Sequence, residues 1–171
     1  MATDVIPEEG APAPSVSMLV RLSDLVNDWS EKLLFVLMVA MIFFTTIQVV
    51  FRVFFTALSW TEEITCFLLV YATLVGTAVA FKKGSHIAVT FITKLLPGAG
   101  QKTVFVIIQL LGIAFFLVMA VYGALLVKTE SLQTSPALMI PMSWVYFVFP
   151  VMGSVVILHL LAGIRQTFRK D

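Results

Sequence analysis

The chain has 171 residues, of which 60% are hydrophobic and 12% are charged, and its mean hydropathy is +1.02. This composition lies far outside the range of soluble domains and predicts an all-α integral membrane protein without a soluble catalytic domain, so we expect no enzyme activity. A formal net charge of +1 argues against nucleic-acid binding, and the single cysteine, Cys66, excludes a disulfide or a cysteine metal site within one chain.

The first 32 residues divide into two segments of different character. Residues 1–17 are rich in proline and begin acidic, which predicts a disordered N-terminal tail rather than a signal peptide. Residues 18–32 separate apolar and charged side chains onto opposite faces of a helix. We expect an amphipathic helix in the membrane interface with Trp29 at headgroup depth, or else a soluble-facing extension of the first span. Its apolar face consists of Leu22, Leu25, Val26, Trp29 and Leu33.

Residues 33–165 form the predicted membrane domain, a bundle of four transmembrane helices. Long apolar stretches place the spans at about 33–55, 62–81, 103–127 and 142–164. At about 1.5 Å per residue, each is long enough to cross a bilayer or nearly so. Residues 166–171 are predicted to form a cytoplasmic tail.

The connection between the first two spans carries three ionisable residues. Arg52 lies near the end of the first span, where it can extend to the headgroups or pair with Glu62 or Glu63 across a short turn. Both glutamates follow Trp60 and lie at a helix start, where negative charge is favourable. An Arg–Glu pair here would hold the first two helices together.

The second span has charges at both ends and small residues in the middle. Lys82 and Lys83 complement the C-terminal end of its helix, and Gly84 is expected to end it. A small residue recurs every four positions, which lets a neighbouring helix from this bundle or from another protein approach closely. These small residues are Ala72, Gly76 and Ala80.

A second interfacial helix is predicted at about residues 86–96. Ile87, Phe91 and Leu95 form one apolar stripe along it. His86 opens this segment and has no ligand-spaced partner, so we interpret it as a helix cap or headgroup contact rather than a metal ligand.

The last two spans contain few polar positions. Gln109 is predicted to form an interhelical hydrogen bond. Pro141 belongs to the turn before the fourth span, and Trp144 belongs to an aromatic belt. Pro150 and Gly153 are predicted to kink the fourth helix.

Positive charges predict the orientation of the chain. Nine of the 11 Lys and Arg residues fall on the side of the four-span topology that carries both termini, and only Arg52 and Lys128 fall on the other. The positive-inside rule therefore places both termini in the cytoplasm.

No feature of a self-sufficient transporter is evident. The ionisable residues cluster at the ends of the spans, the two halves of the chain do not resemble each other, and no nucleophile–base set or metal cluster is visible. These features favour an accessory or scaffold subunit whose outer faces bind a larger membrane partner.

Several motifs resemble the small membrane subunit of tripartite ATP-independent periplasmic (TRAP) transporters, the DctQ-like family. The resemblance covers roughly residues 33–163. One departure is Cys66, where many relatives carry a basic residue, and this puts in doubt any family ion pair at that point. The matching elements are Arg52, the W-T-E-E run from Trp60 to Glu63, Gly76, Lys82-Lys83-Gly84, His86-Ile87, Ser135-Pro136, Ile140-Pro141, Trp144, Pro150 and Gly153.

The resemblance implies a function in a heteromeric, sodium-coupled importer of an organic acid, such as a C4-dicarboxylate or sialic acid, in the bacterial inner membrane. It implies two protein partners, a large multi-helix membrane subunit and a periplasmic substrate-binding protein. Sodium would be bound by the large subunit, and this chain would need no cofactor beyond structural lipid. The motif residues would then serve fold and assembly rather than substrate contact.

Two alternatives from other classes stay open. One is a haem- or quinone-carrying membrane anchor of an oxidoreductase that uses His86 or His159, although a bis-histidine site would need a second ligand in a suitable place. The other is a self-contained small transporter that acts as a homodimer.

Overall fold

The computed structural model describes residues 18–93 and 98–169. Within these ranges the named elements are all helical, and four segments are long and apolar enough to cross a membrane, which confirms the predicted all-α architecture. The elements are α1 (Met18–Phe54), α2 (Ser59–Thr93), α3 (Gly98–Thr129), the 3-10 helix η1 (Glu130–Leu132), α4 (Met142–Tyr146) and α5 (Val148–Arg169). The predicted tail at 1–17, Leu95, and the last two residues lie outside the described residues.

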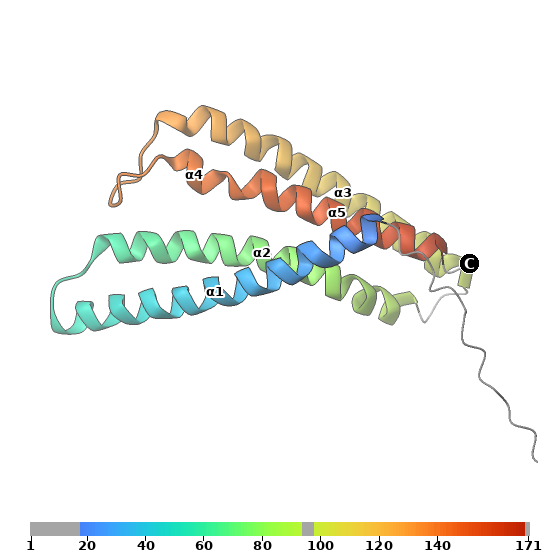
Figure 1. The fold of residues 1–171 in the computed structure, drawn as a ribbon, viewed down its shortest axis with the longest axis horizontal. Coiled ribbons are helices and arrows are strands. Elements are labelled where there is room, and N and C mark those ends of the chain that lie inside the picture. Colours follow the sequence, from blue (N-terminus) through green and yellow to red (C-terminus); the bar gives the residue numbers. More distant parts are fainter. Residues whose placement is uncertain (1–17, 94–97, 170–171) are drawn as a thin grey trace, which may run out of the picture.

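The helices form two antiparallel hairpins, α1–α2 and α3–α5 (Figure 1). The hairpins lie close together at the end that carries the C-terminus and separate toward the end that carries the interhelical loops. Contact between them is made mainly by α2 and α5, with smaller contributions from α1 against α5 and α2 against α3. A small apolar core lies where they meet, and the Phe81 and Phe116 rings pack edge to face there at 5.2 Å. The buried core residues are Ala78, Phe116, Val156 and Leu160.

Helices α1 and α2 are both longer than the spans predicted for them. The sequence of α1 contains no glycine or proline, so the change of composition at residue 32 does not end the helix. The expectation that Gly84 ends α2 is wrong, because the helix continues to Thr93. Glycine costs about 1 kcal/mol inside a helix but keeps its backbone N–H, so it weakens a helix without breaking it. Residues 18–32 are thus an extension of the first span, the alternative that the sequence left open, and residues 86–93 are continuous with α2, while residues 94–96 lie outside the described residues.

The fourth span is interrupted where the sequence predicted a kink. Helix α4 ends at Tyr146, and α5 begins at Val148 after a break at Phe147. Pro150 explains the position of the break, because a proline ring clashes with the carbonyl four residues earlier, which here belongs to Tyr146. Gly153 has a different function from the one predicted: a Cβ added there would lie 3.1 Å from the Phe116 carbonyl oxygen and from Ala120 Cβ, so it allows close packing of α5 on α3.

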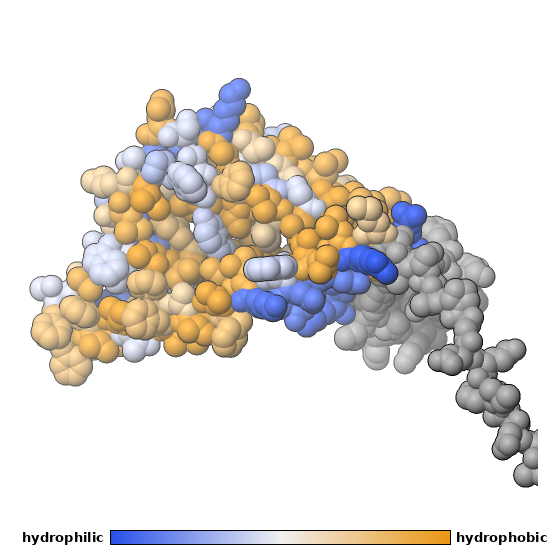
Figure 2. Space-filling model, in the orientation of Figure 1, coloured by the Kyte–Doolittle hydropathy of each residue, from blue (hydrophilic) through white to orange (hydrophobic). Residues whose placement is uncertain are grey.

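The surface is largely hydrophobic, with a band of hydrophilic side chains over the N-terminal half of α1 (Figure 2). Phe35, Ile42 and Val53 of α1 are each at least 60% exposed, as are Leu111 and Phe115 of α3. An apolar surface of this extent is stable only in an apolar surrounding.

Candidate functional site

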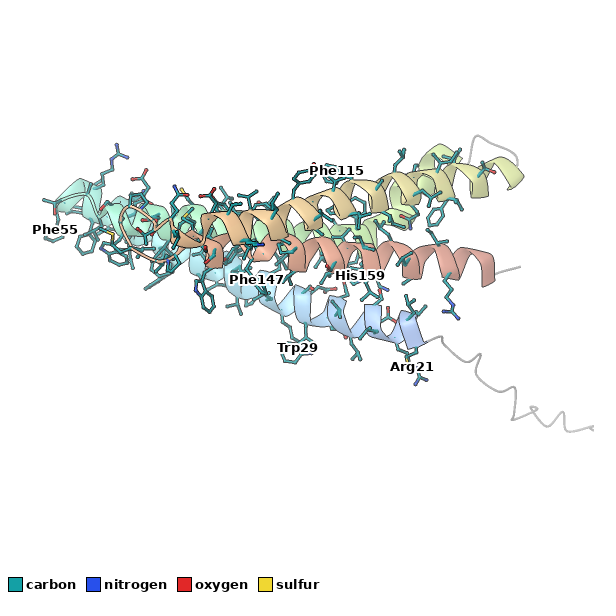
Figure 3. The ribbon with its side chains drawn as sticks, turned by 90° about the horizontal axis from the view of Figure 1, so that it is seen from above. Arg21, Trp29, Phe55, Phe115, Phe147 and His159 are labelled. Carbon is teal, nitrogen blue, oxygen red and sulfur yellow. The ribbon has the colours of Figure 1, made fainter. Side chains whose placement is uncertain are left out.

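A buried polar cluster joins α1, α2 and α5 near the end of the bundle that carries the C-terminus. Ser23, which is fully buried, lies with its Oγ 2.8 Å from His159 Nδ1 and accepts a 2.8 Å hydrogen bond from Lys82 Nζ. Lys82 also forms a 2.7 Å ion pair with Asp24. His159 lies on the side of α5 that faces the N-terminal half of α1 (Figure 3). One serine therefore links three helices.

A second set of polar contacts continues the cluster along α1 and α2. Lys83 Nζ forms a 2.7 Å ion pair with Glu31, and the Asn27 amide donates a hydrogen bond to the other oxygen of the same carboxylate. Asn27 and Ser30 are 7% and 6% exposed. Because Ser23, Asn27 and Ser30 share one helix face, this polar face of α1 is turned toward the other helices.

The apolar face of the same segment is turned outward. Trp29 is 73% exposed, Leu25 60% and Leu22 49%, and Trp29 points away from the bundle (Figure 3). The sequence predicted the two faces, but the structure gives the polar face protein partners instead of water. The outer side of this part of α1 is therefore suited to lipid or to another membrane protein.

Two buried polar atoms in this cluster have no hydrogen-bond partner among the described residues, His159 Nε2 and Asn27 Oδ1. Since Ser23 Oγ accepts from Lys82, its own hydrogen is best used toward His159 Nδ1. The neutral imidazole then carries its hydrogen on Nε2. The cluster is built for interhelical hydrogen bonding, and His159 enters it as an acceptor.

The opposite end of the bundle is organised by Glu63. Its Oε2 accepts hydrogen bonds from the backbone N–H groups of Ala137 (2.8 Å) and Leu138 (3.0 Å) in the loop that joins η1 to α4. That loop is closed by a bridge between Thr134 and Pro141. Glu63 thus connects the N-terminal end of α2 to the second hairpin. This contact lies at the end of the bundle where the two hairpins are apart (Figure 1).

The loop itself has a compact turn structure. Ser135, which is 1% exposed, donates its N–H to the Ile140 carbonyl at 2.9 Å and accepts from Met139 N–H at 3.2 Å. Met139 has a φ of 56°, a left-handed conformation that a side chain tolerates only where surrounding contacts hold it. A further link follows directly after the loop, where the Tyr71 hydroxyl donates to the Trp144 carbonyl at 3.0 Å.

The remaining residues around the first turn are placed differently from the predicted arrangement. Arg52 is exposed and forms no ion pair with a described residue, while Glu63 uses its carboxylate for the distant loop. Glu62 is exposed. Trp60 is 40% exposed and packs edge to face on Phe44 at 6.5 Å, so this contact between α1 and α2 is aromatic.

The stripe of small residues in α2 does not all face one neighbour. Ala72 is buried, Gly76 is half-buried against Leu34 of α1, and Ala80 is exposed. Pro141 precedes the first residue of α4, and Trp144 is 74% exposed. His86, Ile87 and Phe91 belong to the helical backbone of α2, and their side chains are outside the description.

Sequence reasoning missed Ser23, Asn27 and Glu31 as members of the site and considered His159 only as a haem ligand. A signal was present, because Ser23, Asn27 and Ser30 recur at helical spacing. Their partners on α2 and α5 are remote in sequence, since His159 follows Ser23 by 136 positions. The described residues contain no group of three His, Cys, Asp or Glu side chains that could hold a metal ion.

The comparisons with known proteins decide the family. The family described as "Tripartite ATP-independent periplasmic transporters, DctQ component" matches residues 41–170, about three quarters of the chain. The chain belongs to this family. DctQ components are parts of transporters and not an enzyme family, and with its four apolar helices this DctQ component is a multi-pass membrane protein.

Two relatives have sequences similar to this chain, one over most of its own length and the other over a small part of it. The sialic acid TRAP transporter small permease protein SiaQ of Vibrio cholerae is 26% identical over 147 residues, which are 85% of each chain. The sialic acid TRAP transporter permease protein SiaT of Haemophilus influenzae is 26% identical over 118 residues, which are 69% of this DctQ component but only 19% of SiaT. The chain therefore spans about a fifth of the length of SiaT and most of the length of SiaQ.

Proposed function

We propose that this DctQ component is the small accessory subunit of a binding-protein-dependent importer, and that it stabilises a larger membrane subunit that carries the transport path. The observation that carries the proposal is the family match over residues 41–170. The similarity to the small permease protein SiaQ, which covers 85% of that chain, supports it. The match to SiaT, whose length is several times greater, supports a partner that can be fused to such a subunit.

The geometry supports a static subunit. Several of its ionisable groups are engaged in contacts that hold helices together, Lys82 with Asp24 at one end and Glu63 with the α4 loop at the other. Residues that serve in this way are poorly suited to bind and release a substrate or an ion at the middle of the membrane. The exposed sides of α1 and α3 are suited to contact a partner's membrane helices or lipid.

The substrate and energy source follow from the relatives and not from residues of this chain. Both relatives are named as parts of sialic acid transporters, so we propose an organic acid of that class, a carboxylate such as sialic acid or a C4-dicarboxylate. A periplasmic protein would deliver it, and sodium would bind to the large subunit. We place the chain in the bacterial inner membrane with both termini in the cytoplasm, as the distribution of lysine and arginine predicts.

The proposal is tested by purifying the tagged chain from its native membrane in mild detergent and identifying stoichiometric partners by mass spectrometry. We expect a membrane subunit with more than ten spans, and we expect uptake in reconstituted vesicles only when both subunits and the binding protein are present. Transport by this chain alone would contradict the proposal and favour a small homodimeric transporter. A Soret absorption band in the purified chain would favour a haem-carrying anchor.

A further inference from the structure

A groove lies between the two hairpins, at the level where they begin to separate. It has a volume of about 340 Å³ and an almost entirely apolar lining. Leu33 and Leu37 of α1 line it, as do Phe147, which directly precedes α5, and Val151 of α5. Tyr71 and Val75 of α2 complete the lining described here. Trp29, Leu33 and Leu37 follow one another on the same face of α1, four positions apart.

The lining of the groove limits what it can hold. It offers few hydrogen-bond partners, which disfavours a polar ligand. An extended, flexible hydrocarbon chain fits this volume and this lining.

A positive charge lies next to the groove. Lys32 directly precedes Leu33, and its Nζ lies 5.8 Å from the centre of the exposed Trp29 ring. Lys32 is exposed and forms no ion pair with a described residue. The charge-free part of α1 begins at Leu33, so Lys32 and Trp29 are positioned for the headgroup region.

Two of the three acidic residues of this part of α1 are paired with lysines of α2. Asp24 is paired with Lys82 and Glu31 with Lys83, so only the exposed Asp28, one turn before Lys32, remains. An apolar groove with an ammonium group beside it is complementary to a molecule that joins a hydrocarbon chain to a phosphate.

We propose that the groove binds one acyl chain of a phospholipid whose phosphate is held by Lys32 beside Trp29. The lipid lies in the leaflet on the side of the chain termini and fills the space between α1 and the start of α5. It would thereby hold the two hairpins at a fixed separation. The proposal concerns this chain alone and does not depend on the identity of a partner.

The first test fills the groove. Val151→Phe places a ring into the lining, and Val118→Phe makes the same change on the exposed face of α3, where valine is 56% exposed. Native mass spectrometry of the full chain in mild detergent, together with whatever it assembles with, counts retained phospholipids. We expect one fewer lipid per chain in Val151→Phe and no change in Val118→Phe. Equal lipid retention in both variants would overturn the proposal.

The second test addresses the phosphate. The delipidated protein is titrated with phosphatidylglycerol and with a diacylglycerol that has the same chains but no phosphate. Lys32→Gln should weaken phosphatidylglycerol binding by about fivefold, as expected for one basic residue at the headgroups, whereas Lys128→Gln at the other end of the bundle should not. Equal binding of the two lipids, or binding unaffected by Lys32→Gln, would overturn the assignment of the phosphate.

Partner retention is measured in the same samples. Loss of a protein partner in Val151→Phe with the lipid count unchanged would make the groove a protein contact and overturn the lipid proposal. Absence of any protein partner with the lipid result intact would instead count against the proposed function and leave the lipid site in place.

Discussion

Ser23 illustrates how few polar residues set the arrangement of these helices. It is fully buried between Lys82 and His159, which belong to two other helices. Because Ser23 is fully buried, a partner that it loses is not readily replaced by water, so each contact favours one packing. The net contribution of a single hydrogen bond is nevertheless modest, about 0.5–1.5 kcal/mol.

Replacement of Ser23 by alanine should destabilise the chain by about 1–3 kcal/mol, because it leaves His159 Nδ1 and one Lys82 hydrogen without a partner in a buried place. The matched control is Ser154→Ala, since Ser154 is exposed and bonds only the Pro150 carbonyl of its own helix. Thermal unfolding in detergent measures both. Equal shifts of the midpoint in the two variants would show that Ser23 does not link the helices.

Glu63 offers a second test at the level of one residue. Glu63→Ala removes the acceptor of two backbone N–H groups, so the loop before α4 should open more often. We expect hydrogen exchange at Ala137 and Leu138 to accelerate by about tenfold or more, the scale expected for the loss of a charge-assisted hydrogen bond. Glu62→Ala, at the exposed neighbouring position, is the control and should leave exchange unchanged. Acceleration in both variants would assign the effect to the end of α2 and not to the carboxylate.

At the level of the elements, the sequence predicts which segments are helices better than where each one ends. Apolar stretches identify the four spans, because hydropathy over some 20 residues depends little on any neighbour. The ends depend on backbone chemistry: Pro150 breaks the fourth helix at Phe147, whereas Gly84 leaves α2 intact. The polar cluster could be predicted only in part, because the spacing on α1 shows a polar face but not that α2 and α5 cover it.

The glycines that determine packing are also not those that the sequence pattern indicated. A Cβ at Gly123 would lie 2.7 Å from Phe149 Cβ and 3.0 Å from Pro150 Cδ, whereas one at Gly76 would lie 3.7 Å from Leu34. Gly123→Ala should therefore push α3 from α5 and lower stability by about 1–3 kcal/mol. Gly76→Ala should be neutral or slightly stabilising, because alanine favours the helix by about 0.5–1 kcal/mol. Thermal unfolding of both variants measures the difference, and a loss at Gly76 equal to that at Gly123 would contradict this view of the packing.

At the level of the whole molecule, two hairpins are joined at both ends by different chemistry. Side-chain contacts around Ser23 join them near the termini, and Glu63 joins them through backbone N–H groups at the loop end. Between these joints lies the groove beside Phe147. An apolar medium has to fill this space, and the polar joints then keep the hairpins from closing or separating further. The fold is thus a braced element with apolar outer faces, which suits the scaffold function proposed above.

The orientation of this element is open to a direct test. The loop between α1 and α2 and the loop between η1 and α4 lie at the end of the bundle opposite the C-terminus (Figure 1), and the positive-inside rule predicts that this end faces the periplasm. In a Cys66→Ser background, single cysteines are introduced at the exposed positions Thr56, Gln133 and Asp28. A membrane-impermeant maleimide added to cells with a permeabilised outer membrane should label Thr56→Cys and Gln133→Cys. Asp28→Cys should react only after lysis.

Lysed cells provide the control, because all three cysteines must react there for the comparison to be valid. Labelling of Asp28→Cys alone in unlysed cells would show that the chain has the opposite orientation. The positive-inside rule would then have predicted the orientation of this chain wrongly. Labelling of Asp28→Cys and Thr56→Cys from the same side would contradict α1 as a spanning helix. The expected pattern would instead place Lys32, and the lipid proposed to bind beside it, in the cytoplasmic leaflet, because α1 crosses the membrane only once between residues 28 and 56.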